Sequence, residues 1–311
     1  MNKKYVEDNY KTLLITDDDL DGVSCSSVLK AYGVEHDLII TNCYGFESKV
    51  NVDEFKQEGY NRIFITDIMV RPELKDLIDE LDREFELHYI DHHKTSEFYG
   101  YLERNLIECD ESFCSVSLLV DYLKNLGFEL DKDVNAKKLT NFADLITYQD
   151  NSIWITEDYR LPWFLNIIYK ELGYKSFLEE IYYLGFDVNR LVQVHREFVS
   201  KETSILGDLI DKKSNECVKF KYKDFNCSFM RIDRLLKEVG NFYLDEHRDV
   251  DILFMMASNV VMACTHKDHI DLESTFCHVA SAGGNKGKIM INLSNGDLLS
   301  MLIFKLNGEL I

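Results

Sequence analysis

Four carboxylates follow a short run of strand-favouring residues near the start of the chain. They are Asp17, Asp18, Asp19 and Asp21, and residues 13–16 precede them. Clustered carboxylates repel one another and raise each other's pKa unless a cation neutralises them. A buried strand that ends in such a cluster places the charges at its carboxyl end, where open α/β sheets bind ligands. The pattern therefore favours a divalent metal site at this turn.

Two other interpretations of the acidic run are a solvated surface turn and a calcium-binding EF-hand loop, which also opens with D-x-D-x-D-G. An EF-hand loop needs a bidentate Glu at its twelfth position and a helix before it. Counting from Asp17, the twelfth residue is Val28, and a predicted strand precedes the run. The EF-hand interpretation fails on both counts, which leaves the solvated turn as the alternative to a metal site.

Strands and helices alternate along the first third of the chain. The predicted strands are 12–16, 37–43, 62–66 and 86–90, and the predicted helices between them are 22–33, 53–58 and 72–85. Alternation of this kind indicates βαβ units and a mainly parallel sheet with flanking helices.

Further metal-type side chains stand at the ends of two of these strands. Asp67 follows the third strand, and Asp91, His92 and His93 follow the fourth. Alone, Asp67 would be interpreted as a turn or cap residue, and two adjacent histidines as surface residues. Because the carboxyl ends of parallel strands share one edge of a sheet, however, these residues should meet the first acidic cluster. Together they predict a metal site.

The rest of the chain contains further predicted helices and a predicted second domain. Amphipathic helices are expected at 112–127 and 135–148, and a carboxylate near the end of the second, Asp150, is no better a ligand candidate than Asp144 from these residues alone. A long helix is predicted over 187–212. The later segments form a separate, smaller α/β domain with strands at 217–222, 227–232, 252–256, 260–264 and 289–292 and helices at 234–244 and 296–305. The predicted division is 1–186, a connecting helix at 187–213, and 214–311.

Composition limits the classes of partner. The net charge is −20 with a pI near 4.8, which is poorly suited to binding a long duplex by neutralising many phosphates but does not exclude a short nucleotide ligand held by metals. No apolar run approaches the roughly 18–20 residues of a membrane span, and no secretory signal is recognisable. The eight cysteines form no C-x-x-C pair, so a reducing cytoplasm is expected. The apolar helix faces could also serve a homodimer.

Four motifs of this chain resemble those of the DHH phosphoesterase superfamily. They are the Asp-Leu-Asp-Gly run at 19–22, Asp67, the triplet 91–93, and residues 145–154, which look like the fourth motif of nanoRNase B and RecJ-like oligoribonucleases. The C-terminal part is similar to the DHH-associated domain, with Gly283, Gly284 and Asn285 at its glycine-rich substrate loop. The resemblance covers essentially the whole chain, and its N-terminal motifs are the more specific.

The resemblance implies a manganese-dependent phosphoesterase with an active site between a catalytic domain and a substrate-binding domain. One ion would be held by Asp19 and Asp67, and the other by Asp21, Asp67, His92 and Asp150. His93 would contact the scissile phosphate. Asp91 would contact the metal-binding residues without binding an ion itself. Lys286 and Lys288 would meet a substrate phosphate or are ordinary surface lysines.

The chain departs from the family at both ends of the expected site. Asp17 stands where the family usually has His, which would give an all-oxygen first site that Mn²⁺ or Mg²⁺ accepts. Asn285 stands where the glycine loop usually continues with His, and an Arg expected in the preceding strand is replaced near Cys264. These two replacements remove phosphate-binding donors.

The resemblance thus implies a Mn²⁺-dependent phosphodiesterase that hydrolyses short oligonucleotides, nanoRNA or dinucleotides, to 5′-mononucleotides by attack of water at a two-metal site. Three alternatives stay open: a catalytically weakened nucleotide-binding protein, a pyrophosphatase or phosphatase, and a cyclic-nucleotide phosphodiesterase on the same scaffold.

Overall fold

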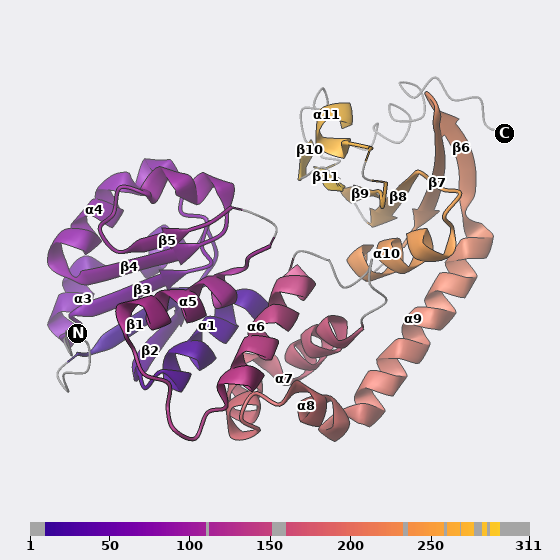
Figure 1. Cartoon of the computed structure of the whole chain (residues 1–311). Coiled ribbons are helices and arrows are strands. Elements are labelled where there is room, and N and C mark those ends of the chain that lie inside the picture. The colour runs from indigo at the N-terminus through magenta and orange to yellow at the C-terminus, as the bar shows by residue number, and fades with distance from the viewer. Residues whose placement is uncertain are drawn as a thin grey trace. The chain divides into compact units, whose positions relative to one another are not determined.

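The computed structural model describes residues 10–109, 112–150, 160–232, 236–257, 260–267, 269–276, 282–284 and 287–292 (Figure 1). The described residues form two compact units, of which one extends to Val199 and the other begins at Ser200. The predicted division at 186/187 and 213/214 stays a prediction. None of the described helices is both long and apolar enough to cross a membrane.

The first unit contains a five-stranded parallel sheet, as predicted. Its strands are β1 (Thr12–Thr16), β2 (His36–Ile40), β3 (Arg62–Thr66), β4 (Glu86–Asp91) and β5 (Asn105–Ile107), in the order β2-β1-β3-β4-β5. Thr16 pairs with Thr66, and Thr66 pairs with Ile90. The residues that follow β1 and β3 and the last residue of β4 therefore lie along one edge of the sheet.

Helices cover both faces of this sheet, which explains why β1 and β3 are buried along their whole length. The helical elements of the unit are α1 (Leu20–Ala31), α2 (Phe46–Lys49), α3 (Val52–Glu58), η1 (Pro72–Leu74), α4 (Lys75–Glu84), η2 (Lys94–Tyr99), α5 (Ser115–Leu126), α6 (Ala136–Asp150), α7 (Leu161–Tyr183) and α8 (Val188–Val194). One core contains strand residues such as Ile15 and Ile63 with Phe46, Phe55 and Ile78 from α2, α3 and α4.

On the other face, α1 packs against β1, α5, α6 and α7. Ten of its twelve residues are buried, so it lacks the polar stripe of a surface helix. Two threonines fix its start to the sheet: Thr16 Oγ1 donates to the carbonyl of Gly22 at 2.7 Å and accepts from Thr66 Oγ1 at 2.8 Å. The first turn of α1 is therefore tied to the ends of both β1 and β3.

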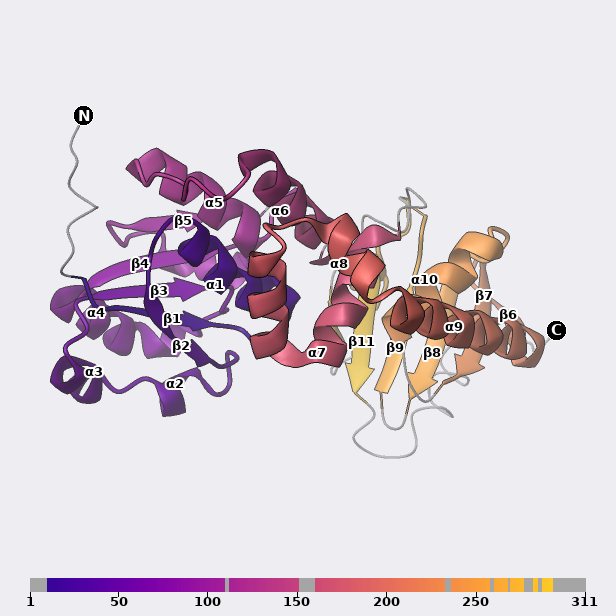
Figure 2. The ribbon, with the colours of Figure 1, turned by 90° about the horizontal axis from the view of Figure 1, so that it is seen from below.

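The second unit confirms the predicted C-terminal α/β domain. Its elements are α9 (Arg196–Glu216, which begins in the first unit), β6 (Val218–Tyr222), β7 (Phe225–Arg231), α10 (Leu236–Glu246), β8 (Ile252–Ala257), β9 (Val260–Cys264), α11 (Leu272–Phe276), β10 (Ala282–Gly284) and β11 (Lys288–Asn292). The six-stranded sheet has the order β10-β11-β9-β8-β7-β6, and its strands from β11 to β6 can be followed side by side in Figure 2. It is mixed, because β7 and β8 pair in parallel and the other neighbours antiparallel.

The single long helix predicted over 187–212 is wrong in one respect. Asp187 caps α8, which ends at Val194, and α9 starts at Arg196 as the long helix. The apolar period continues through both helices, so the pattern could not reveal the break. The helix predicted at 296–305 lies outside the described residues.

Replacing Gly22 by Ala should destabilise the first unit. A Cβ at Gly22 would lie 2.6 Å from the carbonyl oxygen of Asp17 and 2.9 Å from its backbone nitrogen, and backbone cannot move aside as a flexible side chain does. We expect a loss of about 1–3 kcal/mol in the free energy of unfolding, measured by denaturant titration.

The matched control is Gly207→Ala in α9, where a Cβ has no neighbour within 4 Å. There the substitution should stabilise by about 0.5–1 kcal/mol, because alanine is the better helix former. Equal effects of the two substitutions would contradict the close approach at Gly22.

Candidate metal centre

The acidic loop between β1 and α1 is held by its own backbone and by α7. Asp19 is the N-cap of α1, and its Oδ1 accepts a hydrogen bond from the backbone nitrogen of Gly22 at 3.0 Å. Tyr169 of α7 donates its hydroxyl hydrogen to the carbonyl of Asp18 at 2.5 Å. Because Gly22 has no side chain, the first turn of α1 can pack directly on the loop.

Asp21 lies in the first turn of α1 and is anchored to the N-terminus of α5. Its Oδ2 accepts from the backbone nitrogen of Ser115 at 2.7 Å, and its Oδ1 accepts from that of Val116 at 2.9 Å. Free N–H groups and the dipole at a helix N-terminus favour a negative charge. These contacts offset part of the cost of burying a carboxylate that is only 2% exposed.

Asp67 follows β3 in an unusual backbone conformation. Its φ is +58°, in the left-handed region that few residues other than glycine and asparagine or aspartate adopt. Its backbone nitrogen donates to the carbonyl of Ile90 at 3.1 Å, and its Oδ1 accepts from the hydroxyl of Ser115 at 3.1 Å. The neighbouring strand and α5 thus hold the strained residue in place.

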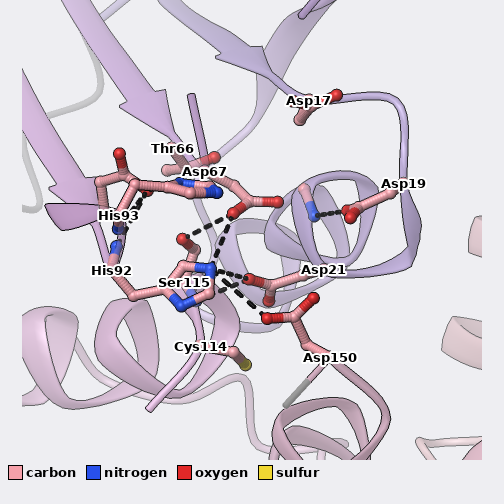
Figure 3. A network of polar contacts seen from close by, with 12 residues as sticks. Asp17, Asp19, Asp21, Thr66, Asp67, His92, His93, Cys114, Ser115 and Asp150 are labelled. Carbon is pink, nitrogen blue, oxygen red and sulfur yellow. Dashed lines mark hydrogen bonds and ion pairs between the residues drawn. The ribbon is translucent and has the colours of Figure 1, made fainter. Parts of the chain in front are cut away.

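Three carboxylates from three different elements converge on one nitrogen of His92 (Figure 3). His92 Nε2 lies 3.4 Å from Asp67 Oδ1, 3.5 Å from Asp150 Oδ2 and 3.8 Å from Asp21 Oδ2. These separations are long for direct hydrogen bonds. They are of the order expected between neighbouring ligand atoms around one cation with bonds of about 2.1 Å.

The electrostatics of the cluster fit a divalent cation. Burial, with the charge of Asp150 adding to it, raises the pKa of Asp21 to about 6. Burial and the charges of Asp21 and Asp19 raise the pKa of Asp67 well above its usual range. A bound cation would relieve this repulsion, and one imidazole with several carboxylates is a donor set that Mn²⁺ accepts.

Asp91 plays a different part, because its oxygens are already engaged. Oδ1 accepts from the backbone nitrogen of His92 and from Nδ1 of His93, both at 2.8 Å, and Oδ2 accepts from the hydroxyl of Ser96. Although Asp91 belongs to a group of potential ligands with Asp67, His92 and His93, these donors compete with any ion for its lone pairs. Asp91 thus contacts the backbone of His92 and the ring of His93.

His93 turns its other ring nitrogen away from Asp91. Its side chain is 39% exposed. Burial would lower the pKa of this imidazole, but the hydrogen bond to Asp91 and the surrounding carboxylates raise it to about 9. The raised pKa favours the protonated form of His93 beside the carboxylate cluster.

The structure does not place all the predicted ligands in this cluster. Asp21, Asp67, His92 and Asp150 lie together, while Asp17 lies apart on the loop in Figure 3, where its Oδ1 accepts from the backbone nitrogen of Asp18 at 2.6 Å. Burial raises the pKa of Asp17 to about 7. A ligand role for Asp17 and Asp19 stays a prediction.

The predicted substrate loop is described in part. Gly283 and Gly284 lie in β10, paired with Met290 and Ile289 of β11. Asn285 and Lys286 lie outside the described residues. Their predicted roles stay predictions.

Sequence reasoning missed Ser115 and Tyr169. Both contact the acidic residues across a large separation in sequence: 48 residues between Ser115 and Asp67, and 151 between Tyr169 and Asp18. The only local signal for Ser115 is its place at the start of a predicted helix, where serine is ordinary.

Comparison with solved structures identifies the architecture. The DHH domain of a protein described as a member of the s1p family of ribosomal proteins aligns with a TM-score of 0.67, at 12% identity, over 94% of this chain and 85% of its own. This chain has the DHH-domain fold. No protein-family model and no curated protein sequence matches it.

Two other solved structures share the DHH-domain fold. The pGpG-specific phosphodiesterase PggH from Vibrio cholerae aligns with a TM-score of 0.54 at 13% identity, over 96% of this chain and 99% of its own. RecJ from Thermus thermophilus in complex with Mn²⁺ aligns with a TM-score of 0.53 at 13% identity, over 96% of this chain. The chain corresponds to about half of that RecJ, 51% of its length.

Divalent cations should stabilise the protein through this cluster. A ligand at one hundred times its Kd stabilises a folded protein by about 2.7 kcal/mol. We therefore expect Mn²⁺ to raise Tm by several degrees over an EDTA-treated sample in differential scanning fluorimetry. His92→Gln should lose most of this increase, because it removes the only nitrogen of the convergent set.

His195→Gln is the control, since His195 lies at the end of α8 and contacts Glu180 at 3.0 Å. That variant should keep the full Mn²⁺-dependent increase in Tm. An undiminished increase in His92→Gln would refute the assignment of His92 as a ligand.

Proposed function

We propose that this protein is a divalent-metal-dependent phosphodiesterase that hydrolyses short oligonucleotides or dinucleotides to 5′-mononucleotides. The observation that carries the proposal is the convergence of Asp21, Asp67 and Asp150 on Nε2 of His92. The DHH-domain fold supports it, because PggH is a phosphodiesterase and RecJ binds Mn²⁺ on this fold.

The residues of the cluster would divide between two ions. Asp21, Asp67, His92 and Asp150 would hold one, and Asp19 with Asp67, and Asp17 if its side chain turns inward, would hold the other. Two bound ions supply Lewis acidity and offset charge on a phosphoryl group. Mn²⁺ suits the mixed imidazole and carboxylate set, and Mg²⁺ is the second candidate.

The other residues would bind and orient the substrate. His93, fixed at Nδ1 by Asp91, presents Nε2 as a donor to a non-bridging phosphate oxygen. Asp91 would hold the backbone of His92 and the ring of His93 in place by accepting a hydrogen bond from each. Gly283, Gly284, Asn285 and Lys286 would contribute to binding the remainder of the substrate.

Charge favours a small substrate over a long polymer. With a net charge of −20, the chain as a whole repels a polyphosphate backbone, and bound cations or a few basic groups would offset that repulsion only locally. Our proposal therefore excludes long duplexes. Seven cysteines among the described residues are free thiols, and we therefore also propose a cytoplasmic location. The homodimer stays a prediction.

A nucleotide-binding protein with weakened catalysis is the second candidate. One observation favours it: the carboxylate of Asp17, which stands where the family usually has His, is engaged with the backbone of Asp18 instead of lying beside Asp67. Tight binding of a nucleotide without turnover would identify this function. A phosphatase, pyrophosphatase or cyclic-nucleotide phosphodiesterase would be identified by its substrate in the same assay.

Asp150→Asn should reduce hydrolysis of a labelled di- to pentanucleotide with Mn²⁺ by about 100-fold or more, because a neutral amide replaces a charged ligand. Initial rates are measured by separating the products, with pyrophosphate, a cyclic dinucleotide and pGpG assayed in parallel. Asp144→Asn, on the same helix α6 but exposed, should change the rate less than about twofold. An active Asp150→Asn variant, or a wild-type protein that turns over none of the oligonucleotides, would contradict the proposal.

A further inference from the structure

Ser115, at the start of α5, contacts two of the candidate metal ligands at once. Its hydroxyl donates to Oδ1 of Asp67 at 3.1 Å, and its backbone nitrogen donates to Oδ2 of Asp21 at 2.7 Å. The residue is fully buried. Figure 3 shows its hydroxyl linked to the carboxylate of Asp67.

The contact with Asp67 decides which oxygen of that carboxylate faces which neighbour. Oδ1 lies 3.1 Å from Ser115 Oγ and 3.4 Å from His92 Nε2. The carboxylate of Asp67 can otherwise rotate about the Cα–Cβ and Cβ–Cγ bonds, and the charge of Asp21 repels it. The hydroxyl therefore opposes a rotation that this repulsion would favour.

Ser115 can do this because a helix fixes its backbone. The cap of α5 is made by other atoms: Ser117 Oγ accepts from the backbone nitrogen of Cys114 at 3.0 Å and donates to its carbonyl at 2.8 Å. The hydroxyl of Ser115 takes no part in that cap and is directed to the carboxylate. The helix end thus holds Asp21 by backbone groups and Asp67 by one side chain.

We propose that Ser115 is a positioning residue that sets the orientation of Asp67, so that Asp67 and Asp21 present their oxygens to the same ion. This inference rests on the proposed function, since it concerns the same site. It adds a residue from α5, an element that supplies none of the four convergent residues, and the side chain of Ser115 itself needs no contact with the ion.

The test compares Mn²⁺ affinity in Ser115→Ala, Ser117→Ala and the wild-type full chain. Removing a hydrogen bond behind a metal ligand typically costs about 10–100-fold in metal affinity. We expect Ser115→Ala to bind Mn²⁺ at least about 10-fold more weakly, measured by isothermal titration calorimetry and by the EPR signal of free Mn²⁺. Ser117→Ala should lower Tm in EDTA through loss of the cap, while its Mn²⁺ affinity stays within about twofold of wild type.

A conservative variant provides the second arm. Ser115→Thr keeps the hydroxyl and should bind Mn²⁺ more tightly than Ser115→Ala, and circular dichroism and Tm in EDTA report whether each variant folds. In the hydrolysis assay, Ser115→Ala should approach the wild-type rate at saturating Mn²⁺, because the ligands themselves remain.

Equal Mn²⁺ affinities of Ser115→Ala and the wild type would overturn the inference, whatever the substrate. An equal loss of affinity in Ser117→Ala would also overturn it, since the effect would then come from the helix end. The affinity measurement contains no substrate. A protein that binds Mn²⁺ and is weakened by Ser115→Ala, yet hydrolyses no phosphoester, would therefore support the positioning role while refuting the proposed activity.

Discussion

The structure of the first unit depends on keeping several buried carboxylates close together. Asp21, Asp67 and Asp91 are each at most 2% exposed at one edge of one sheet, and burial without compensation is costly for every one of them. Each has a different partner: backbone N–H groups of α5 for Asp21, the hydroxyl of Ser115 for Asp67, and the imidazole of His93 for Asp91. These partners offset only part of the negative charge of the three carboxylates, and the charge that remains attracts a cation.

That requirement explains features of the fold that a hydrophobic core alone would not demand. Residue 22 must be glycine because the first turn of α1 packs on the backbone of Asp17. Thr16 and Thr66 link the ends of β1 and β3 by a side-chain hydrogen bond, which holds the two acidic strand ends side by side. Tyr169 reaches from α7 to the same loop. The site is thus supported from the sheet, from α1, from α5 and from α7.

Much of this arrangement could be predicted from the sequence because it follows from local pattern. Alternating strands and helices predicted the parallel sheet, and a parallel sheet necessarily brings the residues after its strands to one edge, which is how Asp67 and His92 could be placed near Asp21. Only the resemblance to the DHH family distinguished Asp150 from Asp144. Local pattern could not reveal Ser115 or Tyr169, because their contacts depend on how distant helices pack. It also could not show that the carboxylate of Asp17 contacts the backbone of Asp18, or that α8 ends at Val194 within a continuous apolar period.

The backbone of Asp67 has a consequence for how such a chain could change over time. At a φ of +58°, the backbone conformation costs glycine or asparagine no more free energy than it costs aspartate. Neither residue would add a buried negative charge. Backbone conformation and charge burial thus both favour replacing Asp67, and only the need for an anionic oxygen favours keeping it. In a descendant that no longer required an ion, asparagine or glycine at position 67 would make the fold more stable. The residue at this position would therefore indicate whether a lineage still depends on its metal.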